Sequence, residues 1–240
     1  METINDLVGY NNLKIYQNDD WFKFSLESVL LPNFVTINPN TKNILDLCTG
    51  NAPIPLILTT RTKAKIIGVE IQKDIYDLAI KTININKLAN QIQIINEDIL
   101  NIKKLYESDY FDIITVNPPY FKVKENSIKN QDIHKTIARH EYKITIEDII
   151  KISKKLLKNN GRLALVHRTE RFFEIIDLLK NNNLIPKKIQ FIYPKVNSES
   201  NLFMIEAVKN GKDGVTFLSP LYVHNEDGTY KEEILKVFQR

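Results

Sequence analysis

The chain has 240 residues, of which 43% are hydrophobic, and its net charge is +4. These values allow one globular domain with a sizeable core over residues 1–240, and the slightly basic balance is compatible with a polyanionic partner. The one cysteine excludes an internal disulfide framework and disfavours a cysteine-based zinc site, so we expect no metal centre. No apolar run reaches the roughly 20 residues of a membrane span, and the polar N-terminus is unlike a signal peptide. We therefore expect a cytoplasmic protein.

Apolar runs that predict strands alternate with segments of helical periodicity. The expected strands are 43–47, 65–70, 91–95, 111–116, 162–166, 189–193 and 203–208. The expected helices are 54–60, 71–86, 145–158 and 170–180, and residues 209–214 resemble a hairpin turn. This alternation predicts an α/β, Rossmann-like fold: a doubly wound, mostly parallel seven-stranded sheet with helices on both faces and an antiparallel C-terminal strand.

Two segments stand outside the alternation. About 40 residues precede the first expected strand, too few for an independent domain, so we interpret them as an N-terminal extension. Residues 121–144 are polar, basic and weakly periodic. A segment of that length without clear secondary structure is usually functional or disordered, and we interpret it as facing the substrate.

The carboxyl ends of the first three strands carry residues suited to a nucleoside-type cofactor, because ligands of doubly wound sheets bind at that edge. Glu70 follows Asp46 by 24 residues, near the roughly 20-residue spacing at which an acid binds ribose hydroxyls. Asp98, after the third strand, is placed to bind an adenine amino group. The candidate cofactor residues of these strand ends are Asp46, Cys48, Thr49, Gly50, Asn51, Glu70, Ile71, Asp98 and Ile99.

Each of these residues has a structural alternative. Asp98 alone fits a helix cap, Glu70 a solvated charge at a helix start, and Cys48 a packed small hydrophobe. A dinucleotide such as NAD is the competing ligand, but its diphosphate needs a glycine-rich helix N-terminus, and this loop has only Gly50. The joint occurrence at three successive strand ends favours a cofactor without phosphate.

The fourth strand ends in Asn117-Pro118-Pro119-Tyr120. Two consecutive prolines remove two N–H donors and fix two φ angles, so the strand stops there. The Asn117 side chain and the Pro118 carbonyl then offer hydrogen-bond acceptors, and Tyr120 offers a flat ring beside them. Such a turn suits a planar amine: an exocyclic amine of a nucleobase that stacks on the tyrosine, or a side-chain amide.

This tetrapeptide resembles motif IV of the S-adenosylmethionine-dependent amino-methyltransferases, and the preceding strand ends resemble motifs I to III of the class I methyltransferases. Cys48 and Ala52 stand where the common motif I has glycine. The resemblance implies S-adenosylmethionine as cofactor and Asn117, Pro118, Pro119 and Tyr120 as catalytic residues, with Asn117 also next to the cofactor. It adds Phe24 and Ser25, in the segment Trp21–Leu31, to the cofactor pocket.

The segments Trp21–Leu31, Ala138–Glu141 and Asn201–Lys209 resemble the bacterial tRNA(Val) adenine-N6 methyltransferases, over about residues 5–235. That family implies methylation of the adenosine immediately 3′ to the anticodon (A37), by direct in-line transfer to a flipped base, with the anticodon stem-loop region of tRNA as partner. Basic residues placed along such an RNA path are Lys122, Lys124, Arg139, His140, Arg168, Arg171 and Lys195.

Several alternatives stay open. The same motif serves methyltransferases that act on a glutamine of a release factor, and other RNA or DNA amino-methyltransferases resemble this core. A catalytically silent RNA-binding subunit is a further possibility, which the intact Asn117–Tyr120 disfavours. Any single lysine is as easily a solvated surface charge, and His167, after the fifth strand, fits the cofactor cleft or a satisfied position at the core edge. The sequence does not distinguish a monomer from a homodimer.

Overall fold

We describe the protein from a computed structural model, which covers residues 1–7, 9–18, 25–120 and 144–238. The chain begins with an antiparallel hairpin of β1 (Glu2–Leu7) and β2 (Tyr10–Asn18), and α1 (Glu27–Phe34) follows. The sequence analysis did not predict the hairpin. Its second strand is fixed to a helix of the main body, because the Tyr16 N–H donates to Thr82 Oγ1 at 3.0 Å.

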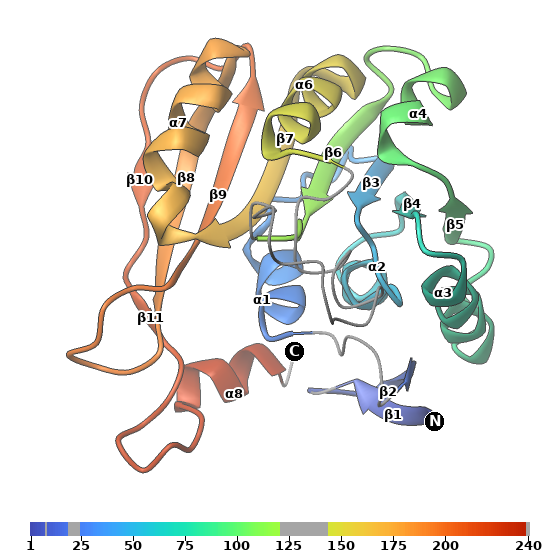
Figure 1. Cartoon of the computed structure of the whole chain (residues 1–240), viewed down its shortest axis with the longest axis horizontal. Helices are drawn as coiled ribbons and strands as arrows, with labels where there is room; N and C mark the ends of the chain where they lie inside the picture. Colours follow the sequence, from blue (N-terminus) through green and yellow to red (C-terminus); the bar gives the residue numbers. More distant parts are fainter. Residues whose placement is uncertain (8, 19–24, 121–143, 239–240) are drawn as a thin grey trace, which may run out of the picture.

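The main sheet has the strand order β10-β8-β9-β7-β6-β3-β4-β5, with β11 beside β8 (Figure 1). Its strands are β3 (Asn43–Leu47), β4 (Lys65–Glu70), β5 (Ile92–Asn96), β6 (Phe111–Val116), β7 (Leu157–Arg168), β8 (Leu184–Tyr193), β9 (Leu202–Lys209), β10 (Thr216–Phe217) and β11 (Leu221–Tyr222). The five strands from β7 to β5 are parallel, and β9 runs antiparallel to both β7 and β8. The predicted fold class is confirmed, and β10 and β11 add two short strands to it.

Helices cover both faces of this sheet. The helices of the main body are α2 (Pro53–Thr59), α3 (Lys73–Ile85), α4 (Ile99–Leu105), α6 (Ile146–Leu156), α7 (Phe172–Asn181) and α8 (Glu232–Phe238), with a 3-10 turn, η1, at Thr169–Arg171. One apolar core joins α1, α2 and α3 to one face of the sheet, and a second joins α4, α6 and α7 to the other. Neighbouring strand residues such as Ile44 and Leu45 enter opposite cores, as the period of two in a strand requires. None of the described helices is long and apolar enough to cross a bilayer.

The buried parallel strands match their predicted bounds closely: β3, β4 and β6 begin and end where the sequence analysis placed them. Two predictions near the C-terminal half are wrong. The helix expected to reach residue 158 ends at Leu156, and the chain is already extended from Leu157 as β7. The turn at 209–214 does not make a hairpin, because β10 pairs in parallel with β8 instead of folding back on β9.

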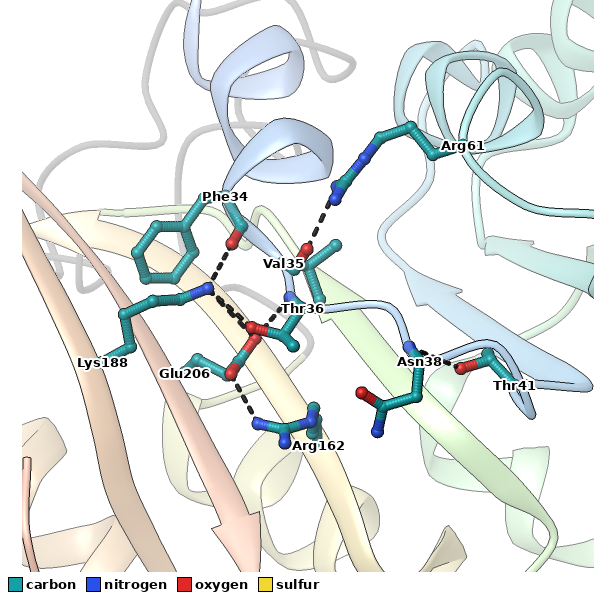
Figure 2. A network of polar contacts seen from close by, with 9 residues as sticks. All are labelled: Phe34, Val35, Thr36, Asn38, Thr41, Arg61, Arg162, Lys188 and Glu206. Carbon is teal, nitrogen blue, oxygen red and sulfur yellow. Dashed lines mark hydrogen bonds and ion pairs between the residues drawn. The ribbon is translucent and has the colours of Figure 1, made fainter. Parts of the chain in front are cut away.

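A polar network holds the C-terminal end of α1 against β8 and β9 (Figure 2). Glu206 on β9 is 1% exposed, and its carboxylate accepts from Arg162 Nη1 at 2.7 Å and from the Thr36 N–H at 2.6 Å. Lys188 Nζ lies 3.6 Å from the same carboxylate and donates to the Phe34 carbonyl at 2.5 Å. These contacts fix the segment that follows α1, and they therefore fix the orientation of α1 on the sheet.

Candidate active site

The structure brings the predicted strand-end residues to one edge of the sheet. β6, β3, β4 and β5 are adjacent and parallel, so the residues that follow them gather at the carboxyl edge. Asn51 follows β3, Ile71 follows β4, and Asn117 follows β6, whereas Asp98 follows β5, at the outer side of the sheet. The candidate cofactor loop and the Asn-Pro-Pro-Tyr turn therefore extend from neighbouring central strands.

The loop after β3 is shaped by three residues in the left-handed region. Cys48 has φ 56°, Gly50 has φ 57° and Ala52 has φ 71°. Cys48 and Ala52 hold a conformation that favours glycine, which explains why glycine suits both positions, and such backbone strain is most common at functional sites. Gly68 on β4 lets the loop pack closely, because a Cβ there would lie 2.8 Å from Thr49 Oγ1.

Glu70 connects this loop to the end of β4. Its carboxylate accepts from the Gly50 N–H at 3.0 Å and from the Gln72 N–H at 2.8 Å. Glu70 is only 6% exposed, and burial raises its pKa above the ordinary value even though the backbone donors of Gln72, Gly50 and Ile71 act in the opposite direction. Each carboxylate oxygen keeps a lone pair that can accept from a ribose hydroxyl.

Asp46 lies below the loop and is fully buried. It accepts from Thr49 Oγ1 and from Thr115 Oγ1, both at 2.6 Å. Burial raises its pKa to about 7, while the two hydroxyl donors lower it. Asp46 is 0% exposed, and its two hydrogen bonds hold the loop and β6 together. Burial and the nearby carboxylates also raise the pKa of the Cys48 thiol, so this thiol stays protonated.

Four further candidates have structural contacts. Asp98 is the N-cap of α4, where it accepts from the Leu100 N–H at 2.9 Å. This contact is the helix cap that the sequence offered as the structural alternative for Asp98. The Asn51 side chain donates to the Tyr16 carbonyl at 2.7 Å and joins the N-terminal hairpin to the loop. Ile99, the first residue of α4, is buried in the apolar core, and the Ile71 carbonyl accepts from Asn96 Nδ2 at 3.2 Å.

The Asn-Pro-Pro-Tyr turn holds its asparagine from two sides. Asn117 Nδ2 donates to Ser28 Oγ on α1 at 3.1 Å, and the Tyr120 hydroxyl donates to Asn117 Oδ1 at 2.6 Å. Burial and the charge of Glu27 raise the pKa of Tyr120 well above its ordinary value, so the hydroxyl remains a donor. Asn117 Oδ1 has two lone pairs, and the tyrosine uses one of them.

His167, at the end of β7, packs against this turn. Its ring lies 5.4 Å from the Tyr120 ring, centroid to centroid, at an interplanar angle of 60°. His167 is fully buried, and its Nδ1 accepts from the Arg168 N–H at 2.8 Å. Burial and the charge of Arg171 lower its pKa to about 3, so the imidazole is neutral and carries its hydrogen on Nε2. The structure places His167 at the core edge against the tyrosine, but its Nε2 has no hydrogen-bond partner among the described residues, so the ring is not fully satisfied there.

The basic candidates divide into three groups. Arg171 is 8% exposed and forms a double hydrogen bond with Glu174, at 2.7 and 3.0 Å, so it stabilises the start of α7. Arg168, the last residue of β7, and Lys195, after β8, are both half-buried, and Arg168 Nε lies 3.4 Å from the Glu170 carboxylate. Outside the described residues lie Phe24, Lys122, Lys124, Arg139 and His140. Ser25 is described and lies just before α1.

The sequence analysis missed three residues that the structure places at this edge. Ser28 contacts Asn117, Thr115 contacts Asp46, and Tyr16 contacts Asn51. Ser28 belongs to the segment Trp21–Leu31, but Glu27 and Ser25 beside it are also polar, so the sequence did not distinguish it from its neighbours. Thr115 and Tyr16 are ordinary strand residues, and nothing in their sequence context marked them.

The site fits a nucleoside-type cofactor. A Cβ added at Gly50 would meet no atom within 4 Å, so the loop backbone borders open space. Glu70 offers carboxylate oxygens beside that space, and its hydrogen bond from the Gly50 N–H holds the loop at the end of β4. No group of three or more His, Cys, Asp or Glu side chains that could hold a metal occurs among the described residues.

Comparisons with known proteins agree with this geometry. The family model described as "Methyltransferase small domain" matches residues 27–191. A tRNA1(Val) (adenine(37)-N6)-methyltransferase of Parabacteroides distasonis is 27% identical over 202 residues, which is 84% of this chain and 83% of the relative. A protein of the same name from Porphyromonas gingivalis, strain ATCC 33277, is 25% identical over 240 residues, covering 97% of this chain and 93% of the relative.

Solved structures show the same fold at lower identity. The crystal structure of a predicted O-methyltransferase from Agrobacterium tumefaciens has a TM-score of 0.69 at 18% identity, over 89% of this chain and 96% of that chain. Geranyl diphosphate C-methyltransferase from Streptomyces coelicolor, in complex with Mg²⁺, geranyl diphosphate and S-adenosyl-L-homocysteine, has a TM-score of 0.59 at 10% identity, over 76% of each chain.

Proposed function

The chain belongs to the methyltransferase small domain family and is a methyltransferase that uses S-adenosylmethionine, and from this premise we propose that it methylates N6 of an adenosine in tRNA. The proposed target is A37, next to the anticodon of tRNA(Val). Two similarities support the proposal: curated relatives that carry this activity in their names match most of the chain, and Asn117–Tyr120 resembles the motif of amino-methyltransferases.

The observation that carries the proposal is the way in which Asn117 is held. Its Nδ2 donates to Ser28 Oγ, and its Oδ1, which accepts from the Tyr120 hydroxyl, keeps one lone pair for a further donor. A target amine can donate one N–H to Asn117 Oδ1 and the other to the Pro118 carbonyl. An exocyclic amine is a poor nucleophile because its lone pair is delocalised into the ring. Two acceptors placed to favour a pyramidal nitrogen localise the lone pair on that nitrogen and make it more nucleophilic. The fixed orientation of the amine supplies much of the rate acceleration.

The remaining residues bind and orient. When bound, S-adenosylmethionine would supply the methyl group of its sulfonium: the C–S bond would break, the amine nitrogen would gain the methyl group and lose one proton to solvent, and S-adenosylhomocysteine would remain. Glu70 and the Cys48–Asn51 loop are the residues we propose to hold it, with Glu70 accepting from ribose hydroxyls. Tyr120 stacks on the flipped base. His167 is neutral and packs behind Tyr120, so it supports the ring and takes no proton near neutral pH.

The RNA is proposed to cross the carboxyl edge near Arg168, the last residue of β7, which lies next to β6. The basic segment 121–143, outside the described residues, follows directly on Tyr120 in the sequence. Binding through phosphates releases counterions, so affinity for tRNA should fall steeply as salt rises. An affinity that does not change with salt would remove these residues from the RNA path.

The test is methyl transfer from labelled S-adenosylmethionine to an unmodified tRNA(Val) transcript, followed by nucleoside digestion and mass spectrometry. N6-methyladenosine at A37, lost in a transcript with guanosine at that position, is the expected result. Label on other RNA alone would contradict the tRNA(Val) assignment, and label only on a release-factor glutamine would replace adenosine by a protein substrate.

The matched enzyme variant is Asn117→Ala. It removes a contact to the reacting amine and not to the cofactor loop, so kcat should fall at least about a hundredfold while the Kd for S-adenosylmethionine changes little. Isothermal titration calorimetry measures the Kd separately from turnover. Normal kcat with weakened cofactor binding would refute the role proposed for Asn117.

A further inference from the structure

Ser28 is a buried hydroxyl in an otherwise apolar part of α1. It is 5% exposed, and the four residues that follow it, Val29 to Pro32, are all buried and apolar. A buried hydroxyl is costly unless it forms a hydrogen bond, so its presence needs a partner that accounts for it. The partner is Asn117, 89 residues away in sequence, whose Nδ2 donates to Ser28 Oγ at 3.1 Å.

The consequence concerns the orientation of the Asn117 side chain. A carboxamide has a donor end and an acceptor end, and rotation by half a turn exchanges them. A target amine, which brings two N–H donors, needs the oxygen. From this contact we propose that Ser28 is a positioning residue for methyl transfer: it holds Nδ2 of Asn117 so that Oδ1 faces the target amine. The inference rests on the function proposed above for Asn117.

Tyr120 alone does not fix this orientation throughout the reaction. Its hydroxyl donates to Oδ1 at 2.6 Å, and as a phenol it is a good donor, so it favours the same orientation as Ser28. Tyr120 is, however, also the residue proposed to stack on the target base. If its ring shifts toward the base, the hydroxyl leaves Oδ1, and Ser28 is then the described residue that still holds the amide.

Ser28 is itself held by the fold. The segment after α1 is bound by the Glu206, Lys188 and Arg162 network of Figure 2, and Arg61 Nη1 donates to the Val35 carbonyl at 3.0 Å. α1 also packs against α2 and α8. A hydroxyl on a helix anchored in this way can determine the position of a side chain on a neighbouring loop.

The test compares Ser28→Ala with Ser28→Thr. The alanine variant should lose about tenfold in kcat, the size expected for one hydrogen bond that aligns a reacting group, while the Kd for S-adenosylmethionine stays within about twofold. Threonine keeps the hydroxyl and should restore most of the rate. Ser153→Ala is the matched control, because Ser153 is 0% exposed on α6 and its Oγ has no partner among the described residues.

A second background separates positioning from mere stability. In Asn117→Asp the two side-chain oxygens are equivalent, so rotation no longer matters. Ser28→Ala should therefore cost much less in that background than in the wild type, whereas a purely structural role would cost the same in both. An equal loss of kcat on Ser28→Ala in both backgrounds would overturn this inference alone. So would a wild-type kcat for Ser28→Ala when Asn117→Ala is inactive. Full activity of Asn117→Ala would overturn the proposed function of the motif and this inference together.

Discussion

The polar network around Glu206 should be one of the most sensitive points of the fold. Glu206→Ala removes the acceptor for Arg162 and for the Thr36 N–H, and it also removes the negative charge paired with Lys188. The side chains of Arg162 and Lys188 are 24% and 20% exposed, so two largely buried cations would lose their carboxylate. Removing one partner of a buried ion pair costs about 3–5 kcal/mol.

Because the two cations retain some contact with water, we expect the lower end, about 3 kcal/mol. For a domain of this size each kcal/mol lowers Tm by about 2–4 °C, so Glu206→Ala should lower Tm by about 6–12 °C. Glu206→Gln keeps a neutral acceptor for the Thr36 N–H and should cost less, about 1–2 kcal/mol.

The assay is urea unfolding at equilibrium, followed by circular dichroism, with thermal melts alongside. The control is Glu147→Gln, which removes an exposed i,i+4 pair with Lys151 and should leave stability unchanged within error. A loss below about 1 kcal/mol for Glu206→Ala would refute the argument, since it would mean that Arg162 and Lys188 find solvent or other acceptors without cost.

Two further predictions concern the loop after β3. Burial raises the pKa of Asp46 to about 7, so between about pH 4 and pH 7 the folded protein binds a proton that the unfolded chain has lost, and stability falls as pH rises through that window. The Asp46→Asn side chain cannot ionise, so this variant should not lose stability in that window. The difference in unfolding free energy, variant minus wild type, should therefore rise by up to about 4 kcal/mol from pH 4 to pH 8 in urea titrations. Parallel pH profiles of the two proteins would contradict this prediction. Glu70→Ala, which frees the Gly50 and Gln72 N–H groups, should raise the Kd for S-adenosylmethionine by about tenfold or more in calorimetry, with near-normal kcat at saturating cofactor. An unchanged Kd, with Glu70→Gln as the matched variant, would exclude Glu70 from the cofactor site.

The sequence by itself determined the central sheet and the order of its strand ends. Strands buried on both faces are nearly continuous apolar runs, so β3, β4 and β6 could be delimited from composition and flanking turns. The Asn-Pro-Pro-Tyr tetrapeptide also carries its own local geometry, because two prolines end a strand wherever they occur. These features depend on residues close together in the chain.

Only the tertiary structure decided what each side chain at that edge contacts. The sequence could place Asp46 at a strand end but not show that two threonines enclose it, one of them 69 residues away. It could not pair Ser28 with Asn117, nor place β10 in parallel beside β8. Such contacts form when separate elements pack, and the energy that selects them is the burial and hydrogen bonding of the whole fold, which no local pattern records.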